Sequence, residues 1–278
     1  MTRYALNPAT PVLLRPDGAV QVGWDPRRAV LVSPPSDFSA AVLAGLLRRL
    51  QSGATLAELQ AQAGDVEPAV VADVIASLVD SGVVTSTAPR PARAASIRIH
   101  GRGPLSDLLA GALRCSGARI THSSRTHAGA PPEPTDLVVL SDYLVSDPRV
   151  VRDLHAAQVP HLPVRVRDGT GLVGPLVIPG VTSCLGCADL HRSDRDAAWP
   201  AVAAQLRDTV GSADRATVLA TAALALNQVD RVIRAVRGGL EVGGSTEPPP
   251  TLDTTLEFDV NAGSIVARRW ARHPRCPC

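Results

Sequence analysis

The chain has 278 residues, of which 45% are hydrophobic, 19% charged and only 3% aromatic, and its formal net charge at pH 7 is +2. This length fits two domains better than one, and the composition excludes a disordered chain and nucleic-acid binding through net charge alone. All 28 basic residues are arginine. Any mechanism that needs a lysine, such as a P-loop or a Schiff base, is therefore excluded.

Targeting signals are not visible in the sequence. The first ten residues lack a basic start followed by an apolar run, and the longest apolar stretch, 218–226, is too short to span a bilayer. We therefore expect a cytoplasmic protein with no membrane partner.

The first 88 residues change from a strand pattern to a helix pattern. Short strands are expected within 11–33, followed by helices from about 39 to 50, from the capping box Thr55-Leu56-Ala57-Glu58 to Gly64, and from Pro68 to Asp80. Strands followed by three helices predict an α+β winged-helix domain over 1–88. The Pro- and Ala-rich stretch 89–95 is the predicted linker.

A winged helix binds either DNA or an extended peptide, and charge separates the two. No arginine occurs from Gln51 to Ala88, where the charged residues are acidic, so this stretch would repel phosphate. An open strand edge beside an apolar helix suits an added peptide strand better. The predicted peptide-binding residues are Val30, Leu31 and Val32 on the edge, and Val71, Val74, Ile75 and Leu78 on the helix. The plainer alternative is a domain that only packs on its neighbour.

From residue 96 strands and helices alternate. Strands are expected at 96–100, 118–121, 136–140, 161–166, 172–178 and 255–267, and helices from 104 to about 115, 148–157 and 213–236. This alternation predicts a Rossmann-like α/β domain with a parallel sheet over 96–278.

Four of the five cysteines form two tight pairs. Cys184 and Cys187 flank Leu185-Gly186, and Cys276 and Cys278 flank one proline. Four thiolates are the usual ligand set of a structural zinc site, which leaves no open position for catalysis. Unrelated thiols and a redox pair are the alternatives. Cys115 stands alone in an apolar helical pattern and is expected to be a buried core residue.

A glycine turn follows the first strand of this domain. Gly101 and Gly103 fit the first two positions of a dinucleotide fingerprint, but Ser106 occupies the third and no acidic residue follows the second strand. A tight structural turn is therefore favoured over a nucleotide site.

These features resemble the ubiquitin-activating-enzyme-like (ThiF/MoeB-like) adenylating family over residues 96–278. The matching segments are Gly101 and Gly103, 136–142, 174–177, the first cysteine pair, 256–259 and 272–278. Working members use a lysine and arginines on the ATP phosphates and have an acidic residue after the second strand. This chain has no lysine, and no counterpart of those arginines or of that acidic residue is visible in its sequence. The resemblance implies a homodimer and a degenerate nucleotide site at Gly101, Gly103 and Asp142, the last at the family's metal-binding aspartate, with no ATP expected.

The segment 187–196 with Trp199-Pro200 resembles partner proteins in thiazole/oxazole-modified peptide biosynthesis, which pair with YcaO-type cyclodehydratases. The N-terminal domain resembles the PqqD-like leader-recognition fold. Together they imply a non-catalytic adaptor that binds the leader of a ribosomally made precursor peptide. His191, Asp194 and Asp196 in this segment could bind a metal, form a polar network or lie in an Arg/Asp-paired surface turn.

Two other functions stay open. One is an active adenylating enzyme that uses only arginine on the phosphates. The other is a zinc-stabilised winged-helix transcription regulator, which would bind DNA with a steep dependence on salt.

Overall fold

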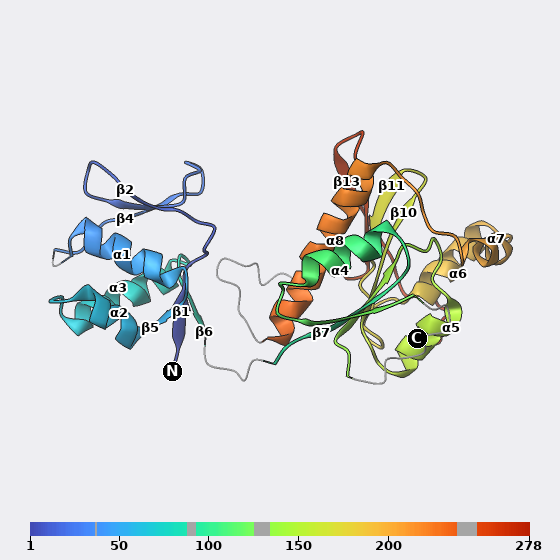
Figure 1. Ribbon diagram of the computed structural model, residues 1–278, viewed down its shortest axis with the longest axis horizontal. Coiled ribbons are helices and arrows are strands. Elements are labelled where there is room, and N and C mark those ends of the chain that lie inside the picture. Colours follow the sequence, from blue (N-terminus) through green and yellow to red (C-terminus); the bar gives the residue numbers. More distant parts are fainter. Residues whose placement is uncertain (37, 88–92, 125–133, 238–248) are drawn as a thin grey trace. The chain divides into compact units, whose positions relative to one another are not determined.

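The computed structural model describes residues 1–36, 38–87, 93–124, 134–237 and 249–278, which form two compact units (Figure 1). Unit 1 contains the described residues up to 87, and unit 2 contains the others. Residues 89–92 of the predicted linker lie outside the described residues. Arg93 and Ala95, at its other end, belong to unit 2, where Arg93 hydrogen-bonds Asp136 at 2.8 Å and Ala95 is buried.

Unit 1 contains two small antiparallel sheets and three helices. The first sheet has the order β2 (Val12–Leu14), β3 (Val20–Val22), β4 (Val30–Val32), and the second has the order β5 (Ala54–Thr55), β1 (Arg3–Ala5), β6 (Thr85–Thr87). The helices are α1 (Ala40–Leu50), α2 (Leu56–Ala63) and α3 (Pro68–Asp80). The second sheet was not expected, because its strands have only two or three residues each and lie far apart in the sequence.

Local signals set the helix boundaries in unit 1. Ser39 caps α1, the reciprocal capping box of Thr55 and Glu58 opens α2, and Pro68 occupies the first turn of α3. Gly64 follows the last residue of α2 with a φ of 67°, a backbone conformation that favours glycine. All three predicted helices are therefore confirmed.

Unit 2 is built on one seven-stranded mixed sheet with the order β13-β12-β11-β10-β9-β7-β8. The strands are β7 (Ser96–His100), β8 (Arg119–Ser123), β9 (Leu137–Ser141), β10 (His161–Arg167), β11 (Thr170–Val173), β12 (Thr254–Asp259) and β13 (Ser264–Arg269). Pairing is parallel among β8, β7, β9 and β10, and antiparallel from β10 to β13. The prediction of a parallel sheet was wrong for β11 to β13. Short turns join β10 to β11 and β12 to β13, so each of these pairs is antiparallel, and β11 also pairs antiparallel with β12.

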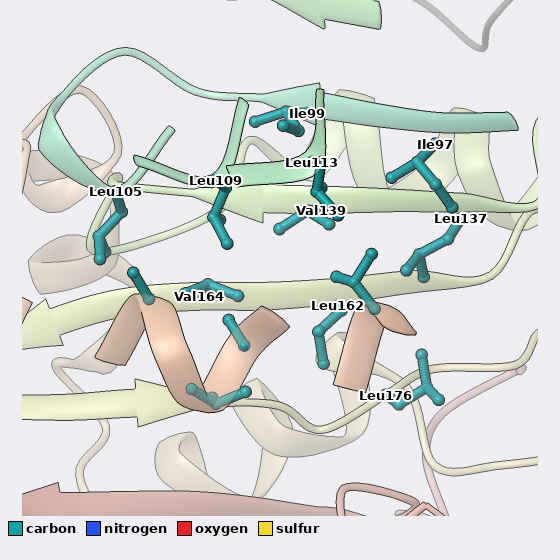
Figure 2. Close-up of a cluster of buried hydrophobic side chains, with 14 of the residues drawn as sticks. Ile97, Ile99, Leu105, Leu109, Leu113, Leu137, Val139, Leu162, Val164 and Leu176 are labelled. Atoms are coloured by element: carbon teal, nitrogen blue, oxygen red, sulfur yellow. The ribbon is translucent and has the colours of Figure 1, made fainter. Parts of the chain in front are cut away.

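Helices cover both faces of this sheet (Figure 1). α4 (Pro104–Leu113) and α8 (Arg215–Val236) pack on one face, while α5 (Pro148–Ala156) and α6 (Leu185–Arg195) pack on the other. Figure 2 shows the core under α4 and α8, where Ile97, Val139, Leu162 and Val164 from neighbouring strands meet Leu109 of α4. Complete burial of such side chains contributes roughly 1.5–3 kcal/mol each.

Three further expectations need correction. Residues 255–267 form two strands, because the chain turns at 260–263. Cys115 is exposed, since α4 ends at Leu113 and the cysteine lies in the turn beyond it. α6 and α7 (Trp199–Leu206) were not predicted, because neither has a long apolar stripe. Among the described helices, none is both long and apolar enough to cross a membrane.

Candidate functional site

The two cysteine pairs meet in unit 2, although almost ninety residues separate them. The Sγ atoms of all four cysteines lie within 4.8 Å of one another. The Sγ atom of Cys184 lies 3.8 Å from that of Cys187 and 3.5 Å from that of Cys276. The Sγ atoms of Cys187 and Cys278 are 3.4 Å apart. Four sulfurs placed about 2.3 Å from one metal ion at tetrahedral corners would lie about 3.8 Å apart. The cluster could therefore hold a metal ion.

The first pair is positioned by the start of α6. Cys184 is the N-cap residue, and its sulfur accepts a hydrogen bond from the Cys187 amide at 3.4 Å. Gly186 lies within α6. Its lack of a side chain matters for space, because a Cβ there would lie 3.4 Å from the Cys184 sulfur. Burial raises the pKa of the Cys184 thiol, so a cation is needed to hold it as thiolate.

A polar network fixes the backbone next to the second cysteine pair, Cys276 and Cys278. The His273 Nδ1 atom accepts from the Arg275 amide at 3.1 Å, so its Nε2 carries the proton and donates to Asp194 at 2.8 Å. This hydrogen bond holds the pKa of the Asp194 carboxyl below its usual value. Arg275 also pairs with Asp194, and His191 contacts the Ala271 carbonyl at 3.0 Å. Asp196 accepts from the Ala198 amide at 2.9 Å, outside this network.

Three interpretations were open for residues 187–196: a metal site, a polar network and a surface turn. His191 and Asp194 take part in a polar network, and both lie on α6 and not in a turn. Within the described ranges, the four cysteines form the only cluster of His, Cys, Asp and Glu with metal-binding spacing.

The glycine turn between β7 and α4 lies at the carboxyl ends of the neighbouring parallel strands β7 and β9, the point at which the order of strands in the sheet reverses. In open α/β sheets, ligands bind at such a switch point. Here the Asp142 carboxylate occupies it, accepting from the amides of Leu105 at 2.9 Å and Ser106 at 3.1 Å. Asp142 is 1% exposed, so these α4 amides, which a phosphate would otherwise use, are bound by the chain itself.

Both glycines are needed for space. A Cβ on Gly103 would lie 2.7 Å from Asp142 Oδ1, whereas one on Gly101 would clash first with the hydroxyl and carbonyl oxygens of Ser141 and would lie 2.9 Å from Asp142 Oδ2. Asp142 has a φ of 72°, and its backbone is fixed by bonds from its amide to the Val164 carbonyl and from the Gly211 amide to its own carbonyl, both at 3.0 Å. The glycines make room for Ser141 and for this internal carboxylate.

The predicted peptide-binding residues of unit 1 fall into two groups. β4 pairs with β3 and is the last strand of its sheet, and Val30 and Leu31 are 40% and 55% exposed. On α3, however, Val71, Ile75 and Leu78 are buried in the core of unit 1, and only Val74 is partly exposed. These three side chains face the core of unit 1 and not a groove. The sequence could not separate the two, because an apolar stripe at helical spacing is the same for a groove and for a core.

Sequence reasoning missed the charged face of β10. Arg165 and Arg167 alternate with the buried Val164 and Val166, and this alternation is the signal of a strand with one polar face.

Comparison of the sequence with protein families and with curated proteins gives no match. Solved structures do match. The heterocyclase TruD aligns with a TM-score of 0.68 at 18% identity over 100% of this chain and 42% of its own, and a heterocyclase in complex with substrate and cofactor aligns with a TM-score of 0.69 at 17% identity. The chain therefore spans less than half of these heterocyclases.

Escherichia coli MccB, solved with ATP, aligns over 99% of both chains with a TM-score of 0.58 at 12% identity. The fold is shared with all three structures. At these identities the likeness concerns the fold alone, and it agrees with the mixed α/β architecture expected for the C-terminal part.

Proposed function

We propose that the chain is a non-catalytic adaptor, which binds the leader of a ribosomally made precursor peptide and presents it to a YcaO-type cyclodehydratase or a similar modifying enzyme. The likeness to TruD carries this proposal. This chain aligns with 42% of TruD, and in this proposal the modifying chemistry belongs to a YcaO-type enzyme that the aligned part does not include. Holding the leader raises the effective concentration of the precursor at that partner.

Unit 1, as a PqqD-like winged helix, provides the proposed leader site at β4. Val30 and Val32 lie on the inner face of the sheet, since they pair with the buried Val22 and Val20, while Leu31 lies on the outer face opposite Gln21. A leader strand beside β4 would hydrogen-bond its open edge and place alternate side chains next to Val30 and Val32.

Unit 2 has a structural role in this proposal. Its four cysteines bind one zinc ion, and its ubiquitin-activating-enzyme-like fold forms a homodimer. Soft thiolate ligands favour zinc over magnesium or calcium. The adaptor then needs no nucleotide of its own, in keeping with the internal carboxylate at the glycine turn.

Leader binding to β4 is tested with proline substitutions on the full chain. Because the amides of a strand point alternately to its two edges, one of Val30→Pro and Leu31→Pro removes a donor from the open edge. We expect that variant to weaken binding of a fluorescent leader, taken from the precursor encoded beside this gene, at least about tenfold by anisotropy.

The matched controls are Leu13→Pro and Leu14→Pro on β2, the opposite edge of the same sheet, which should bind as the parent does once circular dichroism shows them folded. Binding should depend little on salt, because residues 51–88, which contain α2 and α3, offer no arginine to phosphate or to an acidic peptide. Equal binding by all four variants, or duplex DNA binding with a steep salt slope, would refute the adaptor role.

An active adenylating enzyme is the second candidate, and the alignment with ATP-bound MccB over nearly the full length of both chains favours it. ATP–pyrophosphate exchange in the presence of the precursor distinguishes the two functions. Exchange would establish the enzyme, whereas leader binding without exchange supports the adaptor.

A further inference from the structure

A cavity of about 870 Å³ opens in unit 2 on the face of the sheet that α5 and α6 cover. Its floor comes from β10 to β13, its walls come from α5, α6 and the start of α7, and the cysteine cluster borders it. This volume is within the usual range of small-molecule sites. Neither the leader site in unit 1 nor the glycine turn uses it.

Arg165 is an uncompensated cation in this cavity. It extends from β10, is surrounded by protein and keeps partial exposure where it lines the cavity. Burial lowers the pKa of Arg165 to about 10, and the neighbouring Arg192 adds to this effect. Across the ranges that the structure describes, its guanidinium has no hydrogen bond and no carboxylate within ion-pair distance. A buried cation of this kind is costly unless an anion joins it.

Four acidic residues line the cavity, and each already has a partner: Asp168 lies 3.9 Å from Arg167, and Asp196 accepts from the Ala198 amide at 2.9 Å. Glu257 accepts two hydrogen bonds from Arg268, at 2.8 and 3.1 Å, and lies 3.7 Å from Arg167. Asp189 accepts from Arg192 at 2.8 Å and from the indole of Trp199 at 3.2 Å. None of these carboxylates is left to neutralise Arg165.

Apolar and aromatic side chains also line the cavity, beside further charged residues that include Arg152 and Arg195. The Arg192 guanidinium lies 5.1 Å from the Trp199 ring and 5.0 Å from the Trp270 ring, so it contacts both indoles. Trp270 is fixed by a hydrogen bond from its indole to Thr255 Oγ1 at 2.9 Å. The apolar side chains that line the cavity include Leu144, Val151, Leu172, Leu185 and Leu206.

We propose that this cavity binds a carboxylate carried on an apolar or aromatic body, with the carboxylate paired to Arg165 through the two parallel hydrogen bonds that a guanidinium offers. Six arginines and four acidic residues line the cavity, so the charge of its lining favours an anion. The ligand is either a free carboxylic acid or an acidic residue of a peptide.

The first test uses 8-anilinonaphthalene-1-sulfonate, a fluorescent aromatic monoanion, with the full chain. Arg165→Gln should raise its Kd at least about tenfold, while Arg149→Gln, an exposed change of equal charge on α5 outside the cavity, should leave the Kd unchanged. The Tm of Arg165→Gln should not fall, since no partner loses its bond. If Arg165→Gln does not fold, Arg165→Lys replaces it, because it keeps the charge, loses the planar fork and should bind several-fold more weakly.

Competition then identifies the source of the carboxylate. Displacement of the dye by 3-phenylpropionate but not by 3-phenylpropionamide supports a free acid. Displacement by acetyl-Phe-Glu-Phe-amide alone, and not by its Gln analogue, supports a peptide. Dye binding that ignores Arg165, equal displacement by acid and amide, or displacement by pyrophosphate in preference to either acid would overturn the proposal.

Discussion

At the scale of the residue, Asp142 shows how one side chain can complete a turn. Its carboxylate binds two amides at the start of α4 while almost fully buried. Hydrogen bonds to a charged group contribute about 1.5–3 kcal/mol each, and their loss leaves buried donors unpaired. We expect Asp142→Ala to lower the free energy of unfolding by about 2–4 kcal/mol in urea denaturation.

Asp107→Ala is the matched control, because Asp107 lies in the same helical turn and is exposed. Its effect should stay within about 0.5 kcal/mol. Similar losses for the two variants would contradict the capping role of Asp142.

Two buried histidines make stability depend on pH. Burial lowers the pKa values of His161 and His100 to about 4, whereas an unfolded histidine titrates near its ordinary 6.5. Between these values the unfolded chain binds protons that the folded chain does not, so stability falls as the pH drops from about 6.5 to about 4. The slope is at most about 1.4 kcal/mol per pH unit for each histidine.

His161→Leu should make this slope shallower in urea denaturation followed from pH 7 to pH 4. The exposed His122 provides a control, since His122→Gln should keep the slope. An unchanged slope in His161→Leu would show that the histidine is protonated in the folded state.

Some residues of the candidate site could be predicted from the sequence, and others could not. The cysteine spacing predicted the cluster, because few arrangements other than metal binding need four thiols in two tight pairs. The internal bonds of Asp142 could not be predicted, since a metal-binding aspartate and a helix-capping aspartate have the same sequence context. The polar face of β10 could have been predicted from the alternation of Arg165 and Arg167 with Val164 and Val166. The surroundings of Arg165 could not, because they depend on strand pairing, which no local pattern encodes.

At the scale of the element, the cysteine cluster ties the last residues of the chain to α6. If zinc fills it, one ion per chain should be found by elemental analysis of protein purified without added metal. Cys276→Ser with Cys278→Ser should remove the ion and lower the Tm by at least about 10 °C, because structural zinc binding contributes on the order of 10 kcal/mol.

Cys115→Ser is the matched control, since Cys115 is exposed and lies outside the cluster. It should keep both the zinc and the Tm. A chain that is free of metal and equally stable would refute the zinc site.

Elements with strong local signals were predicted well, and those without them were not. α2 had a complete capping box, and β9 is a continuous apolar run. α6 was missed because most of its residues are polar: some line the cavity, and others form the hydrogen bonds around Asp194. The turn that divides β12 from β13 was visible in Asn261-Ala262-Gly263, where Gly263 has a φ of 58°.

At the scale of the whole molecule, the alternating pattern was sufficient to predict an α/β domain after a smaller first domain, whereas the antiparallel half of the sheet depends on long-range pairing. The same fold serves MccB, which was solved with ATP, so fold alone does not decide nucleotide binding. We expect no ATP binding tighter than about millimolar, equivalent to roughly 4 kcal/mol, because the chain has no lysine and α4 already binds a carboxylate.

Isothermal titration calorimetry of the full chain with Mg-ATP checks this expectation. The binding of leader peptide in the same cell serves as the positive control for folded protein. A micromolar Kd for ATP would revive the enzyme.

Asp142 also behaves as a tethered competitor. A carboxylate fixed beside the α4 amides never diffuses away, so its local concentration exceeds any that a free phosphate reaches in solution. A phosphate must break the hydrogen bonds of the Asp142 carboxylate and leave that buried charge without partners. Both free-energy costs weaken the binding of the phosphate. Regaining a nucleotide site would therefore take two coupled changes, removal of the tethered carboxylate and introduction of a cation, and neither change alone would restore binding.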